Sequence, residues 1–222
     1  MGLAVVEAAE RAGVKHLVFS SVLHAIEDRL LQHRSKLAIE QRIIVSDLNW
    51  TILQPTNYML PAWSYPVFKT EVFRLWWSLD RRQSLIVLDD YAEVAAKVIL
   101  EGAAHHGATY ELSSGDCLTA YEIADRFARV TGRPVRAEEV SPDEFMLKHR
   151  KHHAMQALLD AGQTVTSADF PYEFEVFRAI GACYSESDFV GNPNVLTWLL
   201  GRTPTTVEAY LRKEYARFQA SA

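Results

Sequence analysis

Short apolar runs and helix-length amphipathic segments alternate along residues 3–132, and this alternation limits the folds that the chain can form. Apolar runs with the length of buried strands lie at 16–19, 50–54, 84–88 and 108–114. Segments with helical periodicity precede, separate or follow these runs, at 3–12, 27–46, 91–104 and 119–132. Strands that alternate with helices predict an α/β fold, in which a doubly wound parallel sheet is covered by helices on both faces.

Two of these helices carry capping residues at their N-terminal ends. Asp89 or Asp90 is expected to cap the helix at 91–104. Thr119 should cap a later helix, and Glu122 stands three residues after it, where a capping box requires an acidic side chain.

Beyond Ser141 the sequence is rich in Phe, Tyr and His, and its pattern predicts mostly helices. The candidate helices lie at 142–161, 171–185, 193–200 and 204–219. We therefore expect a first domain over 1–140 and a small, mainly helical C-terminal lobe over 141–222, with 56–83 contributing to the lobe. Small helical additions of this kind often form the wall of a pocket beyond the carboxyl ends of the strands.

Composition and charge exclude several classes of function. The net charge of −5 and the isoelectric point near 5.9 provide no basic surface for a nucleic acid or an anionic membrane. No apolar run reaches the length of a membrane span. The two cysteines, Cys117 and Cys183, form no CxxC motif, so we expect neither a disulfide framework nor a thiolate metal site, and a cytoplasmic location.

His149 and His153 stand four residues apart and could chelate zinc from one helix face. The neighbouring cations Lys148, Arg150 and Lys151 oppose a metal ion, and no cysteine lies nearby. We interpret this segment as a solvated helix face and expect no metal site.

Several segments together resemble one protein family. The stretches "AAERAGVKHLVFSSV", "HRSKLAIE", "LNWTILQPTNYM", "DDYAEVAAKVILEG" and "LLGRTPTTVEAYLR" stand in an order that is similar to the NmrA-like family, a branch of the atypical short-chain dehydrogenase/reductases. The resemblance implies a Rossmann-type domain that binds NADP or NAD, with a smaller C-terminal substrate lobe. Members include NADP-sensing transcriptional co-regulators and NADPH-dependent quinone or isoflavone-type reductases.

The resemblance also implies a strand and a GxxGxxG turn ahead of the first helix, where glycines let the backbone approach the cofactor phosphates. The first twenty residues contain only Gly2 and Gly13. We therefore expect a truncated, partial Rossmann-type sheet that binds the dinucleotide poorly. The strand at 16–19 would then have an exposed edge, which predicts a homodimer through that edge, aggregation, or dependence on a protein partner.

Lys36 and the position four residues before it are the first candidates for a catalytic site. Short-chain dehydrogenases use a Tyr four residues before a Lys as the general acid, but Gln32 occupies that position here. His33 lies about 100° further around the helix and does not simply replace the Tyr. Lys36 is thus a candidate contact to the nicotinamide ribose, with a solvated lysine as the alternative.

The remaining candidates follow two predicted strands. Ser20 and Ser21 end the first strand, where α/β folds bind ligands. The serine that is catalytic in related reductases would fall closer to Val22, so loop serines that cap backbone groups remain an alternative. Pro55, Thr56, Asn57 and Tyr58 follow the strand at 50–54, and the resemblance implies that they pass beside the nicotinamide; an ordinary polar turn is the alternative.

Three functions stay open at this point. The first is an NAD(P)H-dependent reductase of small molecules, similar to quinone or isoflavone reductases. The second is a non-catalytic regulator that senses NAD(P) or binds a protein partner, which the Gln at position 32 favours. The third is an inactive truncated gene product, which the missing glycine-rich turn favours.

Overall fold

A three-stranded parallel sheet forms the base of the molecule. The computed structural model describes residues 2–149 and 153–221. The strands are β1 (Leu17–Ser20), β2 (Trp50–Pro55) and β6 (Ala108–Leu112), in the order β1-β2-β6, and both pairs are parallel. The α/β fold with parallel strands is confirmed.

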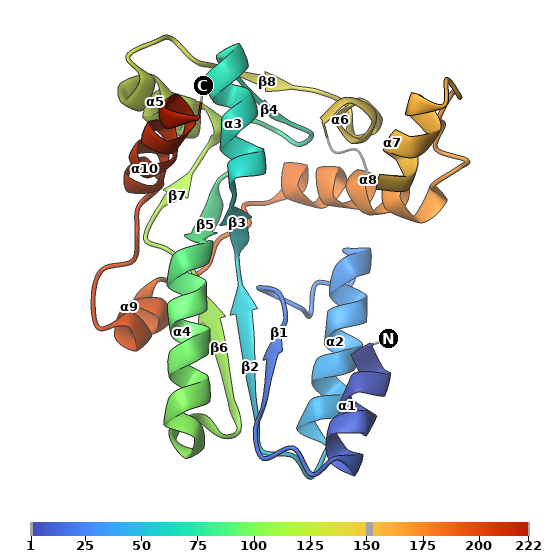
Figure 1. The fold of residues 1–222 in the computed structure, drawn as a ribbon, viewed down its shortest axis with the longest axis vertical. Helices are drawn as coiled ribbons and strands as arrows, with labels where there is room; N and C mark the ends of the chain where they lie inside the picture. Colours follow the sequence, from blue (N-terminus) through green and yellow to red (C-terminus); the bar gives the residue numbers. More distant parts are fainter. Residues whose placement is uncertain (1, 150–152, 222) are drawn as a thin grey trace.

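Helices cover both faces of this sheet (Figure 1). On one face, α1 (Gly2–Arg11) and α2 (Leu31–Ile44) pack through Val6 and Ile43 onto Ile52 of β2. On the other face, α4 (Leu88–Glu101) and α9 (Asn194–Leu200) pack onto Leu53 and Leu112. Because side chains alternate along a strand, the adjacent residues Ile52 and Leu53 serve opposite helical layers.

The apolar run at 84–88 does not extend the basal sheet. It forms β5 (Gln83–Val87), which pairs in parallel with β3 (Asn57–Met59) and antiparallel with β7 (Cys117–Leu118). The reason lies in β2, whose chain continues through Thr56 directly into β3 and so provides a new pairing partner beyond the carboxyl end of the sheet. All five residues of β5 are buried, the polar Gln83 and Ser84 as well as the apolar residues 85–87.

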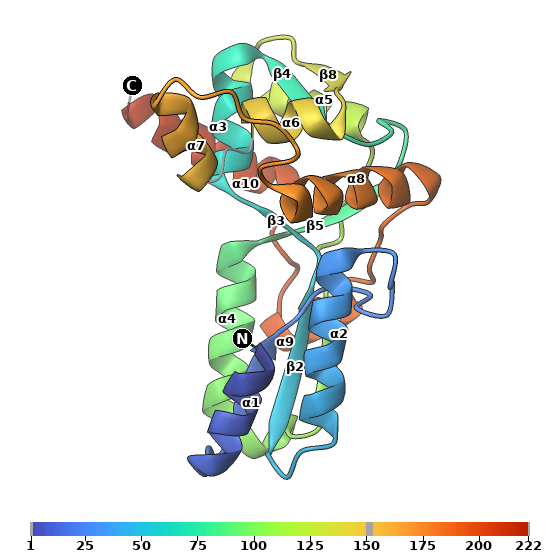
Figure 2. The ribbon, with the colours of Figure 1, turned by 90° about the vertical axis from the view of Figure 1, so that its right-hand side faces the viewer.

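A second unit lies beyond the carboxyl ends of the basal strands (Figures 1 and 2). Its core joins α3 (Pro61–Thr70), α5 (Ala120–Thr131) and α10 (Val207–Ala220) around Phe68 and Phe127. A two-stranded parallel sheet of β4 (Val72–Leu75) and β8 (Arg136–Glu139) lies against α5.

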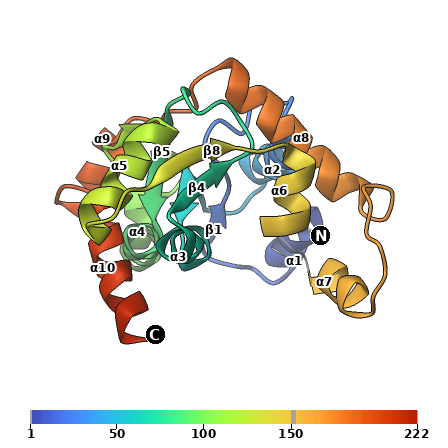
Figure 3. The same ribbon diagram turned by 90° about the horizontal axis from the view of Figure 1, so that it is seen from above.

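Three further helices extend this unit to one side, where they lie together in the view from above (Figure 3). These are α6 (Pro142–His149), α7 (His153–Asp160) and α8 (Pro171–Glu186). The expected single helix over 142–161 is thus described as α6 and α7. The second unit draws α5 and β8 from before residue 140, whereas α9 from after it packs on the basal sheet; the division into 1–140 and 141–222 stays a prediction.

The helix ends test the capping predictions. Thr119 caps α5, its hydroxyl accepts the N–H of Glu122, and the Glu122 carboxylate accepts the N–H of Thr119, so the capping box is confirmed. The prediction for α4 is wrong, because Val87 precedes the helix and no side chain caps it. Asp90 is instead buried, and it binds the Arg202 guanidinium at 2.9 Å.

Strand β1 pairs on one side only within the described residues. Leu17 and Ser21 donate their N–H groups to carbonyl oxygens of the β2 segment. The N–H and C=O groups of successive residues point to opposite sides of a strand. The backbone N–H of Val18 therefore points to the open side. Exposed apolar side chains lie on the two neighbouring helices, among them Val5 and Ile44, which are 55% and 52% exposed.

We predict that the 222-residue chain associates through this edge. The weight-average mass from sedimentation should rise between about 1 and 100 μM protein, a range typical of weak association. Val18→Pro should abolish the rise, because proline removes an N–H group that the β1–β2 ladder does not use. Leu100→Lys, at an 85% exposed position on α4, is the matched control and should leave association unchanged. A monomer at all concentrations would contradict the prediction.

Candidate functional site

Lys36 of α2 reaches the end of β1. Its ammonium donates to the carbonyl oxygen of Ser20 at 2.6 Å, and it lies 4.9 Å from the centroid of the Phe19 ring. Desolvation by burial lowers the pKa of Lys36, whereas the charge of Glu40 acts in the opposite direction. By the alternation of β1, the Ser20 carbonyl faces the open side of the strand, so Lys36 binds the last free carbonyl of that edge.

Tyr58 meets Ser20 from the other side. Its hydroxyl interacts with those of Ser20 and Tyr91, and burial together with Tyr91 raises the pKa of Tyr58 above its ordinary value. The rings of Tyr58 and Tyr91 lie edge to face, with centroids 5.4 Å apart. The structure thus brings Ser20, Lys36 and Tyr58 together at the carboxyl end of β1.

Ser21 and Thr56 lie beneath this group. Their residues are only 4% and 3% exposed, and neither hydroxyl has a partner among the described residues. Their backbone N–H groups bind the carbonyls of Leu53 and Leu112, at 2.7 and 3.0 Å. A buried hydroxyl without a hydrogen bond lowers the stability of the folded protein. These two hydroxyls are therefore available to form hydrogen bonds with water or a ligand.

Gln32 lies one helical turn before Lys36 and has no proton to donate as an acid. Its amide oxygen is buried without a partner among the described side chains. His33 turns elsewhere, since its Nδ1 lies 3.0 Å from the carbonyl oxygen of His24 and its ring packs edge-on against Phe189. Burial lowers the pKa of His33, so this buried imidazole is neutral at pH 7.

Two of the predicted residues face away from the group. The Asn57 amide donates to Gln83 at 3.4 Å, and its side chain also interacts with Tyr184. Pro55 is buried, and its carbonyl accepts the N–H of Leu23 at 2.8 Å. Both act within the junction between the basal sheet and the second unit.

Sequence reasoning missed three neighbours of the site, namely Glu40, Gln54 and Tyr91. Glu40, 6% exposed, accepts the Gln54 amide at 2.9 Å beside Lys36, and Tyr91 pairs with Tyr58. The spacing of Glu40 one turn after Lys36 was a usable signal, because such residues share a helix face. No local pattern connects Tyr91 with Tyr58, since they meet only through the packing of α4 against β3.

Other features of the described chain lie elsewhere. No cluster of three His, Cys, Asp or Glu side chains that could hold a metal ion occurs in residues 2–149 and 153–221, and the side chains of His149 and His153 fall outside what is described. The helices described are too short or too polar to cross a membrane.

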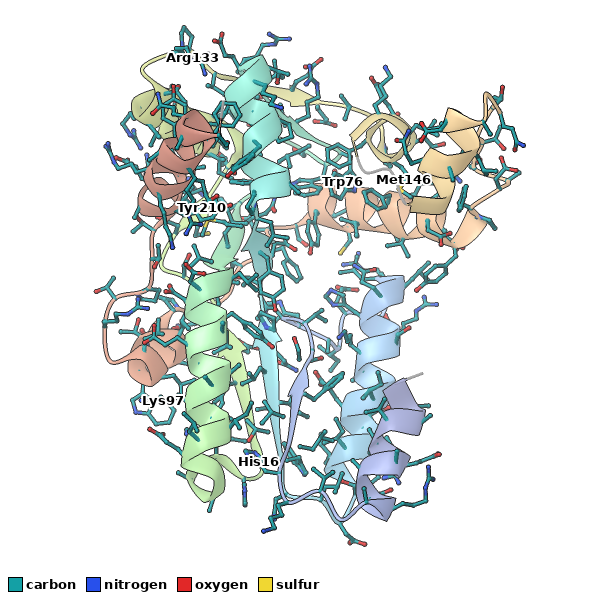
Figure 4. All side chains as sticks on the ribbon, in the orientation of Figure 1. His16, Trp76, Lys97, Arg133, Met146 and Tyr210 are labelled. Carbon is teal, nitrogen blue, oxygen red and sulfur yellow. The ribbon has the colours of Figure 1, made fainter. Side chains whose placement is uncertain are left out.

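Two grooves, of about 470 and 290 Å³, lie along α10. Tyr210, which is labelled in Figure 4, lines the smaller groove together with residues of α3 and α4. None of the predicted site residues lines either groove.

The family model described as the NmrA-like family matches residues 1–169. The chain belongs to this family. It is 26% identical over 207 residues to quinone oxidoreductase 2 of Escherichia coli, covering 91% of this chain and 66% of that protein. It is 32% identical over 144 residues to (4-alkanoyl-5-oxo-2,5-dihydrofuran-3-yl)methyl phosphate reductase of Streptomyces griseus, covering 63% and 50%.

Solved structures share the fold. The NADPH-dependent quinone oxidoreductase of Escherichia coli superposes with a TM-score of 0.75 at 22% identity, covering 96% of this chain and 72% of that one. NmrA, a negative transcriptional regulator solved in complex with NAD, superposes with a TM-score of 0.66 at 15% identity, covering 99% and 71%. The chain spans only about half to two thirds of the length of the curated relatives, at 50% and 66% for the two named above.

Proposed function

We propose that these residues form the nicotinamide and acceptor side of an NAD(P)H-dependent reductase that acts on quinones. The observation that carries the proposal is the placement of the Lys36 ammonium at the carbonyl of Ser20, at the carboxyl end of β1 and beside Tyr58. This is the edge at which α/β sheets bind ligands. An ammonium has three protons, and the bond to Ser20 uses one of them, which leaves donors for the ribose hydroxyls of the cofactor.

The acceptor follows from Gln32. Reduction of an aldehyde or ketone needs a proton at the forming alkoxide, and an amide cannot supply it. A quinone that accepts hydride becomes a hydroquinone anion, which water can protonate after the transfer. The site therefore suits a quinone better than a simple carbonyl compound.

The dinucleotide is NADPH or NADH by family resemblance, and we propose that this chain binds it weakly by itself. The 222 residues contain no GxxGxxG turn, and the site offers contacts for the nicotinamide ribose but no cradle of backbone N–H groups for the pyrophosphate. We propose a small-molecule substrate and a cytosolic location.

We predict that NADPH binds the 222-residue chain with a dissociation constant weaker than about 10 μM, measured by calorimetric titration. Because only the nicotinamide half finds its contacts, reduced nicotinamide mononucleotide should support quinone reduction at a rate within about threefold of that with NADPH. Stoichiometric binding of NADPH in the low micromolar range, or a strong preference for the whole dinucleotide, would contradict this.

Substitution at position 32 tests the choice of acceptor. With high NADPH, we expect measurable oxidation by a quinone and no detectable reduction of an aldehyde. Gln32→Tyr should add aldehyde reduction, because a phenol one turn before Lys36 can donate the missing proton. Arg34→Tyr, at an exposed position on the same helix, is the matched control and should add none. If Gln32→Tyr behaves as the control does, position 32 does not hold the missing acid.

A non-catalytic regulator is the second candidate, and Gln32 is the observation that favours it. It would bind NAD(P) or a protein partner without turnover. Quinone-dependent oxidation of NADPH that is lost in Lys36→Met would exclude this candidate. An absence of turnover in the unmodified chain would favour it, or an inactive product, over the reductase.

A further inference from the structure

Two tyrosines from separate elements pack against each other beside Ser20, and the ribose contact proposed for Lys36 uses neither of them. Tyr58 lies in β3 and Tyr91 in the first turn of α4, and both side chains are half-buried. Their rings meet edge to face, with centroids 5.4 Å apart and planes at 79°. Aromatic walls with a few fixed polar groups are typical of small-molecule sites.

The hydroxyl of Tyr58 lies close to two other hydroxyls. It interacts with the hydroxyls of Ser20 and Tyr91, and Ser20 is itself fixed through its carbonyl by Lys36 at 2.6 Å. Tyr58 thus lies one residue away from the proposed ribose contact. Burial raises the pKa of Tyr58 above its ordinary value, so this phenol keeps its proton at neutral pH and has one hydrogen bond to donate.

We propose that Tyr58 and Tyr91 bind the electron acceptor, with the Tyr58 hydroxyl donating a hydrogen bond to a carbonyl oxygen of a planar quinone. This inference rests on the proposed reductase function. The reduced nicotinamide transfers hydride, two electrons and one proton, to the quinone and becomes the oxidised nicotinamide. The product is a hydroquinone monoanion whose oxyanion accepts the Tyr58 hydrogen bond, and water supplies the second proton.

The hydrogen bond explains how the site can work without an acid at position 32. A fixed donor stabilises the charge that develops on the quinone oxygen without giving up its proton. Tyr91 keeps the Tyr58 ring and hydroxyl in position, and its own ring extends the apolar wall. The two phenols therefore act on the acceptor and leave cofactor binding unaffected.

The test compares Tyr58→Phe and Tyr91→Phe with the unmodified chain. Tyr121→Phe, on α5 and 49% exposed, is the matched control. The acceptor is 2,3-dimethyl-1,4-naphthoquinone, whose substituted ring does not alkylate thiols. Tyr58→Phe should raise the KM for this quinone about fivefold, the effect of one hydrogen bond, with the KM for NADPH unchanged. Tyr91→Phe should show a smaller rise, and the control none.

Binding of the same quinone, followed by line broadening of its NMR signals, provides a readout that does not need turnover. If the folded Tyr58→Phe variant oxidises NADPH with an unchanged quinone KM, the inference is overturned and the reductase function stands. If the unmodified chain binds the quinone through Tyr58 but never oxidises NADPH, the acceptor site stands and the reductase function is overturned. If there is neither binding nor turnover, both are overturned.

Discussion

One continuous extended segment, residues 50–59, connects the two units and fixes the geometry of everything between them. As β2 it is bonded on both sides, by β1 and β6. Pro55 ends this ladder because it has no N–H group, yet the N–H of Thr56 still reaches the carbonyl of Leu112 at 3.0 Å. The same chain then pairs with β5 as β3. Tyr58 is therefore held over the end of the sheet by backbone hydrogen bonds on both sides of Thr56.

The open edge of β1 gives Lys36 its place. A strand edge presents unpaired carbonyls, and a cation that reaches the last of them forms a charge-assisted hydrogen bond. Lys36 accepts some desolvation to make this bond, as the lowered pKa indicates. Glu40 acts on Lys36 through its charge, while one of its carboxylate oxygens accepts the Gln54 amide at 2.9 Å. A strand edge, an aromatic ring and one lysine thus produce a donor aimed at the carboxyl end of the sheet.

The sequence predicted the elements better than their connections. The basal strands follow from the short apolar runs, and the capping box at Thr119 follows from the spacing of Thr119 and Glu122. The contact between Lys36 and Ser20 was not predicted, because no local pattern relates a residue of α2 to the end of β1. The placement of β5 could not be predicted, because its apolar run is the same whether it lies in the basal sheet or beyond it. Asp90 illustrates the same limit: an acidic residue at a helix start suggests a cap, and only the fold brings Arg202 to it.

The junction between the units combines fixed contacts at its rim with unsatisfied polar groups inside it. At the rim, Arg29 binds Glu186 of α8 at 2.6 Å, and Phe189 packs on His33 of α2. Further in, the hydroxyls of Ser21 and Thr56 have no partner among the described residues. Because an apolar junction would exclude water and these hydroxyls attract it, the junction is suited to ordered solvent. In the proposed quinone reductase, solvent at this place would supply the proton that Gln32 cannot.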